Sequence, residues 1–229
     1  MKVEIFTVIK NEEHILPFFI NHYRNAFSEC IINIYDNNST DKSIEICKAN
    51  NCNVFDFPDF IPYLKEDVLT DLKNNVWKNS NADWIIVCDV DELLQITENN
   101  IQVLPVDVNI ISTKGYNMID LNNENLSLEK LVYGVYAPPY CKKIMFKNKY
   151  ISDMNYEIGA HKCNPVPMPV YSEHVYTLLH YNKHNFTLET FYKNFEDIKK
   201  TLNENQIKII NDALNTLFES NKLLAIKVL

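Results

Sequence analysis

Residues 84–92 read Trp84-Ile85-Ile86-Val87-Cys88-Asp89-Val90-Asp91-Glu92, an apolar run that ends in acidic residues. A run this continuous and this rich in β-branched residues predicts a strand that is buried on both faces, as in parallel sheets. The acids then emerge where the strand leaves the core, and open α/β sheets bind ligands at that edge. Asp89 and Asp91 can both be turned toward one hard cation, for which Mg²⁺ or Mn²⁺ is suitable.

The Asp-x-Asp spacing is weak on its own, because it arises about once by chance in a chain of this composition. Its surroundings add weight. Further strands are predicted at residues 3–9, 31–35 and 52–57, with helices between them, and this alternation predicts a parallel sheet. The first, second and fourth strands are followed by polar clusters, which are Lys10-Asn11-Glu12, Asp36-Asn37-Asn38-Ser39 and Asp89-Val90-Asp91-Glu92. Any one cluster could simply cap a helix or form a turn, but all three should meet at one crevice.

The second half of the chain is less regular. Short strands are predicted at residues 108–113, 131–136, 143–147 and 174–179, and helices at about 188–202 and 204–223. We therefore expect an α/β fold with a mostly parallel sheet flanked by helices, in a single domain over residues 1–229. Residues 1–95 would form a nucleotide-binding half and residues 96–229 an acceptor half with C-terminal helices.

Composition excludes several classes of function. The 229 residues carry a formal net charge of −8, which argues against a nucleic-acid partner. Only 3 glycines occur, well separated, so the clustered glycines of P-loop and Rossmann phosphate-binding loops are absent. The 6 cysteines form no Cys-x-x-Cys pair and are expected to be reduced. With neither a signal peptide nor a transmembrane segment in the sequence, a cytoplasmic location is expected.

The motifs as a set resemble those of glycosyltransferases with the GT-A fold, specifically the family 2-like group. The opening strand and its polar end stand as Val8-Ile9-Lys10-Asn11-Glu12-Glu13-His14. The second-strand signature stands as Asp36-Asn37-Asn38-Ser39-Thr40-Asp41, and the Asp-x-Asp-Glu motif as Asp89-Val90-Asp91-Glu92. The resemblance covers roughly residues 3–94, with the motifs in the same order and at similar spacing.

The resemblance implies a nucleotide-sugar donor, expected to be uridine-linked, and an inverting transfer to a saccharide or other hydroxyl acceptor. It places Asp36 near the base, Asp89 toward the ribose or a metal-bound water, and Asp91 on the Mn²⁺ or Mg²⁺ that bridges the diphosphate. The resemblance implies further donor-site residues. A basic residue lies about fifteen positions before the Asp-x-Asp motif in related enzymes, and Lys73 occupies that place here. The strand-end motifs contribute Val8, Lys10, Asn11, Glu12 and Asn38.

The second half supplies the remaining candidates. A late histidine completes the metal site in many GT-A enzymes. His180 is favoured because it follows an apolar strand and precedes a polar turn. The alternative is a histidine that only forms hydrogen bonds at the end of a strand. The general base is sought in Glu157, Asp153 or His161, with His161 also a candidate for the acceptor pocket. Lys142 and Lys143 stand at the start of a late strand and can help neutralise phosphate, and Lys143 is assigned to the donor site.

Two other functions remain open. A sugar-phosphate nucleotidyltransferase would share the α/β design and the metal, but it would need a glycine-rich basic loop after its first strand. A catalytically silent carbohydrate-binding module could keep the fold, although it would have no need of Asp89 and Asp91. The oligomeric state is not assigned.

Overall fold

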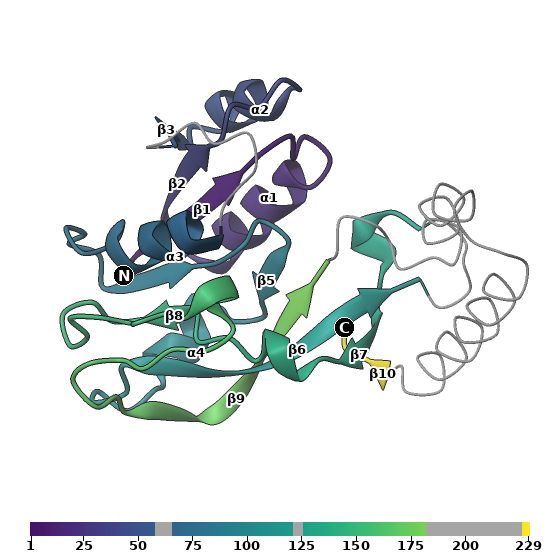
Figure 1. Ribbon diagram of the computed structural model, residues 1–229. Coiled ribbons are helices and arrows are strands. Elements are labelled where there is room, and N and C mark those ends of the chain that lie inside the picture. The colour runs from purple at the N-terminus through teal and green to yellow at the C-terminus, as the bar shows by residue number, and fades with distance from the viewer. Residues whose placement is uncertain (58–65, 121–125, 182–225) are drawn as a thin grey trace, which may run out of the picture.

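A computed structural model describes residues 1–57, 66–120, 126–181 and 226–229 (Figure 1). Its first part alternates strands and helices, in the order β1 (Lys2–Ile9), α1 (Leu16–Ala26), β2 (Glu29–Asp36), α2 (Ser43–Ala49), β3 (Asn53–Asp56), α3 (Glu66–Asn75) and β4 (Trp84–Val87). The four strands are parallel and lie side by side in the order β4-β1-β2-β3. The parallel sheet predicted for this part of the chain is confirmed.

β1 is the central strand of this sheet. Ile5 lies opposite Ile32 of β2 and Ile86 of β4. Because side chains alternate along a strand, Ile5 and Phe6 point to opposite faces. Ile5 packs in the cluster that holds the buried residues of α1, whereas Phe6 packs with Trp77, which follows α3. All four residues of β4 are buried, as the apolar run predicts.

The second part extends the sheet with antiparallel strands. Its elements are β5 (Glu92–Leu94), α4 (Glu98–Gln102), β6 (Ile110–Ile119), η1 (Leu128–Lys130), β7 (Tyr133–Tyr136), η2 (Pro138–Tyr140), β8 (Met145–Phe146), η3 (Ile158–Ala160), β9 (Tyr171–His180) and β10 (Ile226–Lys227). β8 pairs with both β4 and β6 and so joins the two parts into one sheet, in the order β10-β7-β6-β8-β4-β1-β2-β3. β9 pairs in parallel with β6 and antiparallel with β5.

The predicted α/β class is thus confirmed, with differences in detail. The first helix begins at Leu16, several residues after the end of β1, and Asn11 between them has a φ of +56°. β6 and β9 are each longer than predicted. The helices predicted at residues 188–202 and 204–223 lie outside the described residues, and the domain division stays a prediction. No helix in the described part of the chain is long and apolar enough to cross a membrane.

A glycine in β6 allows the 137–141 segment to approach the sheet. A Cβ added at Gly115 would lie 2.4 Å from the backbone carbon and oxygen of Tyr140. The Ala137 N–H donates to the Gly115 carbonyl at 2.9 Å, so the approach is fixed by hydrogen bonding as well as by shape. Any larger residue at position 115 must push Tyr140 away from the sheet.

We therefore expect Gly115→Ala to lower the free energy of unfolding by about 1–3 kcal/mol, the range for inserting atoms into a packed site. The matched control is Gly134→Ala in β7, where the nearest atom to an added Cβ is the Cβ of Tyr116 at 3.1 Å, a tight contact but not an overlap. Urea denaturation of both variants measures the difference. Equal losses in the two variants would show that Tyr140 does not lie against Gly115.

Candidate functional site

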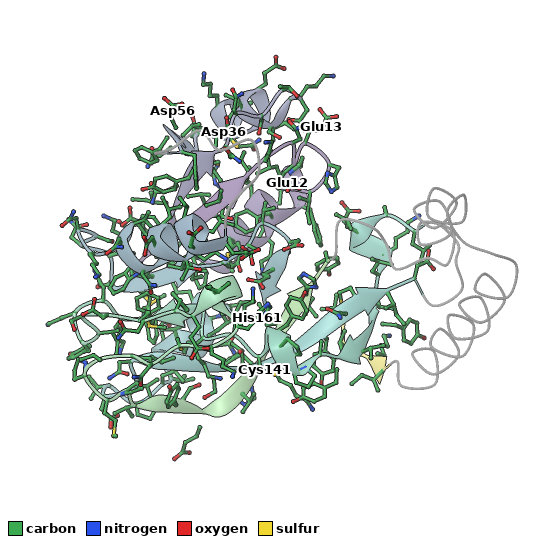
Figure 2. All side chains as sticks on the ribbon, viewed as in Figure 1. Glu12, Glu13, Asp36, Asp56, Cys141 and His161 are labelled. Carbon is green, nitrogen blue, oxygen red and sulfur yellow. The ribbon has the colours of Figure 1, made fainter. Side chains whose placement is uncertain are left out.

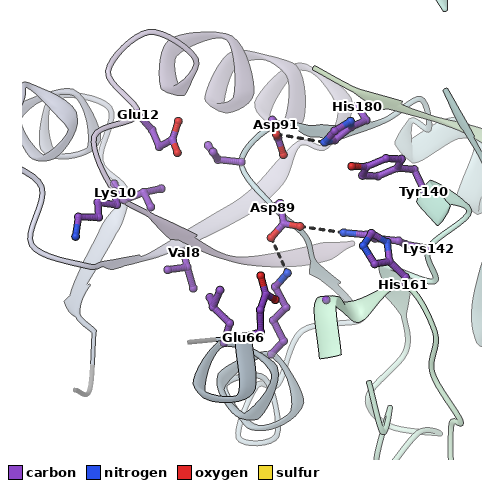
Figure 3. Close-up of a pocket in the computed structure, with 15 residues that line it drawn as sticks. Val8, Lys10, Glu12, Glu66, Asp89, Asp91, Tyr140, Lys142, His161 and His180 are labelled. Carbon is purple, nitrogen blue, oxygen red and sulfur yellow. Dashed lines mark hydrogen bonds and ion pairs between the residues drawn. The ribbon is translucent and has the colours of Figure 1, made fainter. Parts of the chain in front are cut away.

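A cavity of about 300 Å³ opens at the carboxyl ends of β1 and β4 (Figure 3). Both parts of the chain line it. The first part contributes Val8, Ile9, Lys10, Glu12, Glu66, Leu69, Lys73, Asp89, Val90 and Asp91, and the second part contributes Tyr140, Lys142, Gly159, His161 and His180. The cavity therefore lies where the sequence predicts a ligand site, at the edge of a parallel sheet.

The acidic turn after β4 is held by hydrogen bonds between its two ends. The Asp89 N–H donates to the Glu92 carboxylate at 3.1 Å, and the Glu92 N–H donates to the Asp89 carbonyl at 3.0 Å. Glu92 then enters β5, where it lies opposite His180 of β9. This turn places Asp89 and Asp91 in the cavity and keeps Glu92 fully buried beneath them.

Two lysines hold Asp89. Lys73 of α3 donates to Oδ1 at 2.5 Å, and Lys142 donates to Oδ2 at 2.9 Å (Figure 3). Burial alone would raise the pKa of Asp89, but the two ammonium groups outweigh burial and hold that pKa well below its usual value. Asp89 is therefore a carboxylate whose two oxygens are both already engaged by protein cations.

Lys142 also forms a buried ion pair with Glu92, at 2.6 Å. Only 3% of the Lys142 side chain and none of the Glu92 side chain are exposed. Burial disfavours the charge on Lys142, but Glu92 and Asp89 more than compensate, and the Lys142 pKa is raised. Burial and the neighbouring Asp89 raise the pKa of Glu92. Lys142 is thus a charged group that joins the segment before β8 to the acidic turn after β4.

Asp91 faces His180. Asp91 Oδ2 lies 3.4 Å from His180 Nε2, and His180 Nδ1 lies 2.8 Å from Asn117 Oδ1. Because an amide oxygen only accepts, Nδ1 is the donor in that bond. In a neutral His180, Nε2 then carries a lone pair that faces the carboxylate. Tyr140 stacks on the His180 ring at a centroid distance of 3.7 Å and fixes its orientation.

Two acceptor atoms that face each other need a proton or a cation between them. Two ligands at right angles on one Mg²⁺ lie about 3 Å apart, given metal–oxygen distances near 2.1 Å. The 3.4 Å separation of Asp91 Oδ2 and His180 Nε2 fits such a cation with little movement. Within the described residues no group of three or more His, Cys, Asp or Glu residues could hold a metal. The chain there supplies a pair of ligands, and a cation would take its others from water or phosphate.

Eight of the predicted site residues line the cavity, namely Val8, Lys10, Glu12, Lys73, Asp89, Asp91, His161 and His180. The second-strand cluster does not join them. Asp36 accepts hydrogen bonds from the Ser39 N–H, Asn38 has a φ of +57° in the turn, and Asn11 Oδ1 accepts from the Thr40 N–H at 2.7 Å. Figure 2 shows Asp36 and Asp56 at the end of the molecule away from His161.

Three predicted residues of the second half also lie off the cavity lining. The Lys143 ammonium lies 5.9 Å from the ring centre of Tyr171, Asp153 pairs with Lys78 at 2.6 Å, and Glu157 is exposed. His161 lines the cavity, and its Nδ1 donates to the Pro139 carbonyl at 2.8 Å.

Sequence reasoning missed Tyr140 and chose Lys143 over Lys142. A signal for Lys142 does exist in the sequence. Lys142 lies two residues from Ile144, the spacing at which an extended chain places two side chains on the same face, although the strand itself begins only at Met145. Both are buried. The contact between Tyr140 and His180 depends on the approach at Gly115, which no local pattern indicates.

Comparisons with known proteins give structural likeness only. No protein-family model matches the chain, and no curated protein matches it in sequence. Among solved structures, S. aureus TarS 1–349 in complex with UDP is 14% identical, with a TM-score of 0.48, over 84% of this chain and 63% of that one. Glucosyl-3-phosphoglycerate synthase from Mycobacterium tuberculosis, in complex with Mn²⁺, UDP and glucosyl-3-phosphoglycerate, is 12% identical, with a TM-score of 0.39, over 70% and 62% of the two chains.

The mannosyltransferase PcManGT from Pyrobaculum calidifontis, in complex with GDP-Man and Mn²⁺, is 13% identical, with a TM-score of 0.40, over 65% of this chain and 45% of that one. The match to TarS 1–349 without UDP covers 60% of that protein's chain. The chain thus spans less than two thirds of the length of each of these proteins.

The buried ion pair yields a prediction on stability. Glu92→Ala removes a buried partner of Lys142 and the acceptor of the Asp89 N–H, so we expect the free energy of unfolding to fall by about 3–5 kcal/mol. Glu173→Ala, at an exposed position of β9, serves as control and should change it by less than about 0.5 kcal/mol. Chemical denaturation measures both. A loss below about 1 kcal/mol for Glu92→Ala would contradict the role given to this pair.

Proposed function

We propose that this protein is a metal-dependent glycosyltransferase that moves a sugar from a nucleoside-diphosphate donor, expected to be uridine-linked, to a hydroxyl acceptor. The observation that carries the proposal is the pair of Asp91 and His180, 3.4 Å apart, in a cavity that lysines also line. The sequence resemblance to family 2-like GT-A enzymes independently assigns Asp91 to the cation. The cavity lies at the sheet edge at which α/β proteins bind nucleotides.

Asp91 and His180 would hold Mn²⁺ or Mg²⁺, and the bound cation supplies Lewis-acid neutralisation of the diphosphate leaving group. The residues of the chain do the rest. Asn117 holds the His180 tautomer, so that Nε2 faces Asp91. Lys73 and Lys142 keep Asp89 ionised and directed into the cavity, where a carboxylate can accept a hydrogen bond from a ribose hydroxyl.

His161 is the best placed of the three predicted general bases. It lines the cavity, whereas Asp153 is paired with Lys78 and Glu157 does not line it. Because His161 Nδ1 donates to the Pro139 carbonyl, Nε2 has the lone pair that a base needs. Gly159 leaves room for this ring, since a Cβ there would lie 2.9 Å from His161 Cδ2. His161 would take the proton of the acceptor hydroxyl as the new glycosidic bond forms.

The cation site is tested by Asp91→Asn. The amide keeps the shape of the side chain but loses the charge, so we expect Mn²⁺-dependent binding of UDP to weaken by at least tenfold. Asp107→Asn, at an exposed position away from the cavity lining, should bind like the wild type. Calorimetric titration of UDP, and of GDP in parallel, with and without Mn²⁺ measures the effect. If neither nucleotide binds the wild type, or Asp91→Asn binds as well as the wild type, the proposal is wrong.

The base is tested by His161→Asn. We expect slow Mn²⁺-dependent hydrolysis of a nucleotide sugar by the wild type, in which water replaces the acceptor, and a fall of about 10²- to 10⁴-fold in the variant, the range for losing a general base. UDP affinity should be unchanged. His174→Asn, at an exposed position of β9, is the matched control. Hydrolysis at the wild-type rate would exclude His161 as the base, and no hydrolysis by the wild type would favour a silent binding module.

A further inference from the structure

Two ammonium groups face the cavity beside the Asp91 and His180 pair. Lys73 and Lys142 both line it, and each is anchored on the same carboxylate, Asp89. They come from distant parts of the chain, one from α3 and the other from the segment before β8. Convergence of two lysines on one aspartate from separate elements is not a by-product of local structure.

Each lysine keeps hydrogen-bonding capacity. A lysine ammonium has three N–H donors. Within the described part of the structure, Lys73 uses one donor on Asp89, and Lys142 uses two, one on Asp89 and one on Glu92. At least one donor on each lysine is left for a ligand in the cavity. Burial of both side chains makes any such contact stronger than it would be in water.

The N–H donors of the lysines, and not their net charge, favour an anionic ligand, because Asp89 and Glu92 balance the charges of Lys73 and Lys142. A divalent cation bound by the Asp91 carboxylate has a single positive charge left over, which is less than the charge that a diphosphate brings. Glu92 is fully buried behind the turn, whereas Lys142 reaches the cavity, so the positive end of this pair faces the ligand.

We propose that Lys142, together with Lys73, binds the diphosphate of the donor directly, so that two protein cations and one metal share its charge. This inference rests on the proposed nucleotide donor, and it gives Lys142 a ligand-binding role in addition to its ion pairs. Asp89 acts as the positioning residue that holds both ammonium groups at one edge of the cavity.

The test compares ligands that differ only in phosphate. UDP and uridine are titrated by calorimetry into the wild type and Lys142→Met at saturating Mn²⁺. We expect the variant to lose at least tenfold in UDP affinity and to bind uridine unchanged. Lys149→Met changes an exposed lysine after β8; this variant is the control and should bind both ligands like the wild type. Unchanged UDP affinity, or an equal loss for UDP and uridine, would overturn the proposal.

Lys142→Met strands a buried carboxylate, so folding has to be controlled. The double variant Glu92→Gln and Lys142→Met removes both charges of the pair and should show the same selective loss of UDP affinity. Inorganic pyrophosphate separates this inference from the proposed function. If the wild type binds pyrophosphate but neither UDP nor GDP, and Lys142→Met loses pyrophosphate, the phosphate site stands and the nucleotide donor is wrong. If the wild type binds none of these ligands, both proposals fail.

Discussion

The Lys142 ammonium connects the two parts of this protein at the point where their surfaces form a cavity. Its contacts with Asp89 and Glu92 join the segment before β8 to the turn after β4, with almost no exposure to water. Such a pair is stable only when all its members are present, since one partner left alone is a buried, uncompensated charge. Together with Lys73 and the hydrogen bonds between Asp89 and Glu92, it holds the acidic turn and Asp89 at the cavity.

A second constraint acts through packing. Gly115 lets the backbone at Tyr140 lie against β6, and Tyr140 in turn stacks on His180. Asn117, two residues further along β6, holds the other side of the His180 ring. One strand thus orients the histidine from two directions, so that Nε2 faces Asp91. The proposed cation ligands therefore depend on contacts outside the Asp-x-Asp motif, and rigid placement of this kind favours specific metal binding.

The parallel part of the sheet could be predicted from the sequence, because apolar runs such as residues 84–88 alternate with helical segments. The meeting of Lys10, Glu12, Asp89 and Asp91 at one edge followed from the same reasoning. Asp36 does not line the cavity, because its carboxylate accepts a hydrogen bond from the Ser39 N–H within the turn that follows β2. Tyr140 was not predicted at the site, and Lys142 was noted only as a lysine that can neutralise phosphate. The stacking of Tyr140 on His180 and the pairing of Lys142 with Asp89 and Glu92 join segments that are far apart in the chain, and local periodicity does not report such contacts.

We propose that Asp91 and His180 bind the cation while Lys73 and Lys142 bind the diphosphate. A crystal structure with Mn²⁺ and UDP, with the metal located by its anomalous scattering, tests it directly. We predict Mn²⁺ within about 2.2 Å of Asp91 Oδ2 and His180 Nε2, and phosphate oxygens at hydrogen-bond distance from Lys73 and Lys142. Mn²⁺ bound to Asp89 in place of the lysines, or a diphosphate that contacts neither lysine, would contradict it.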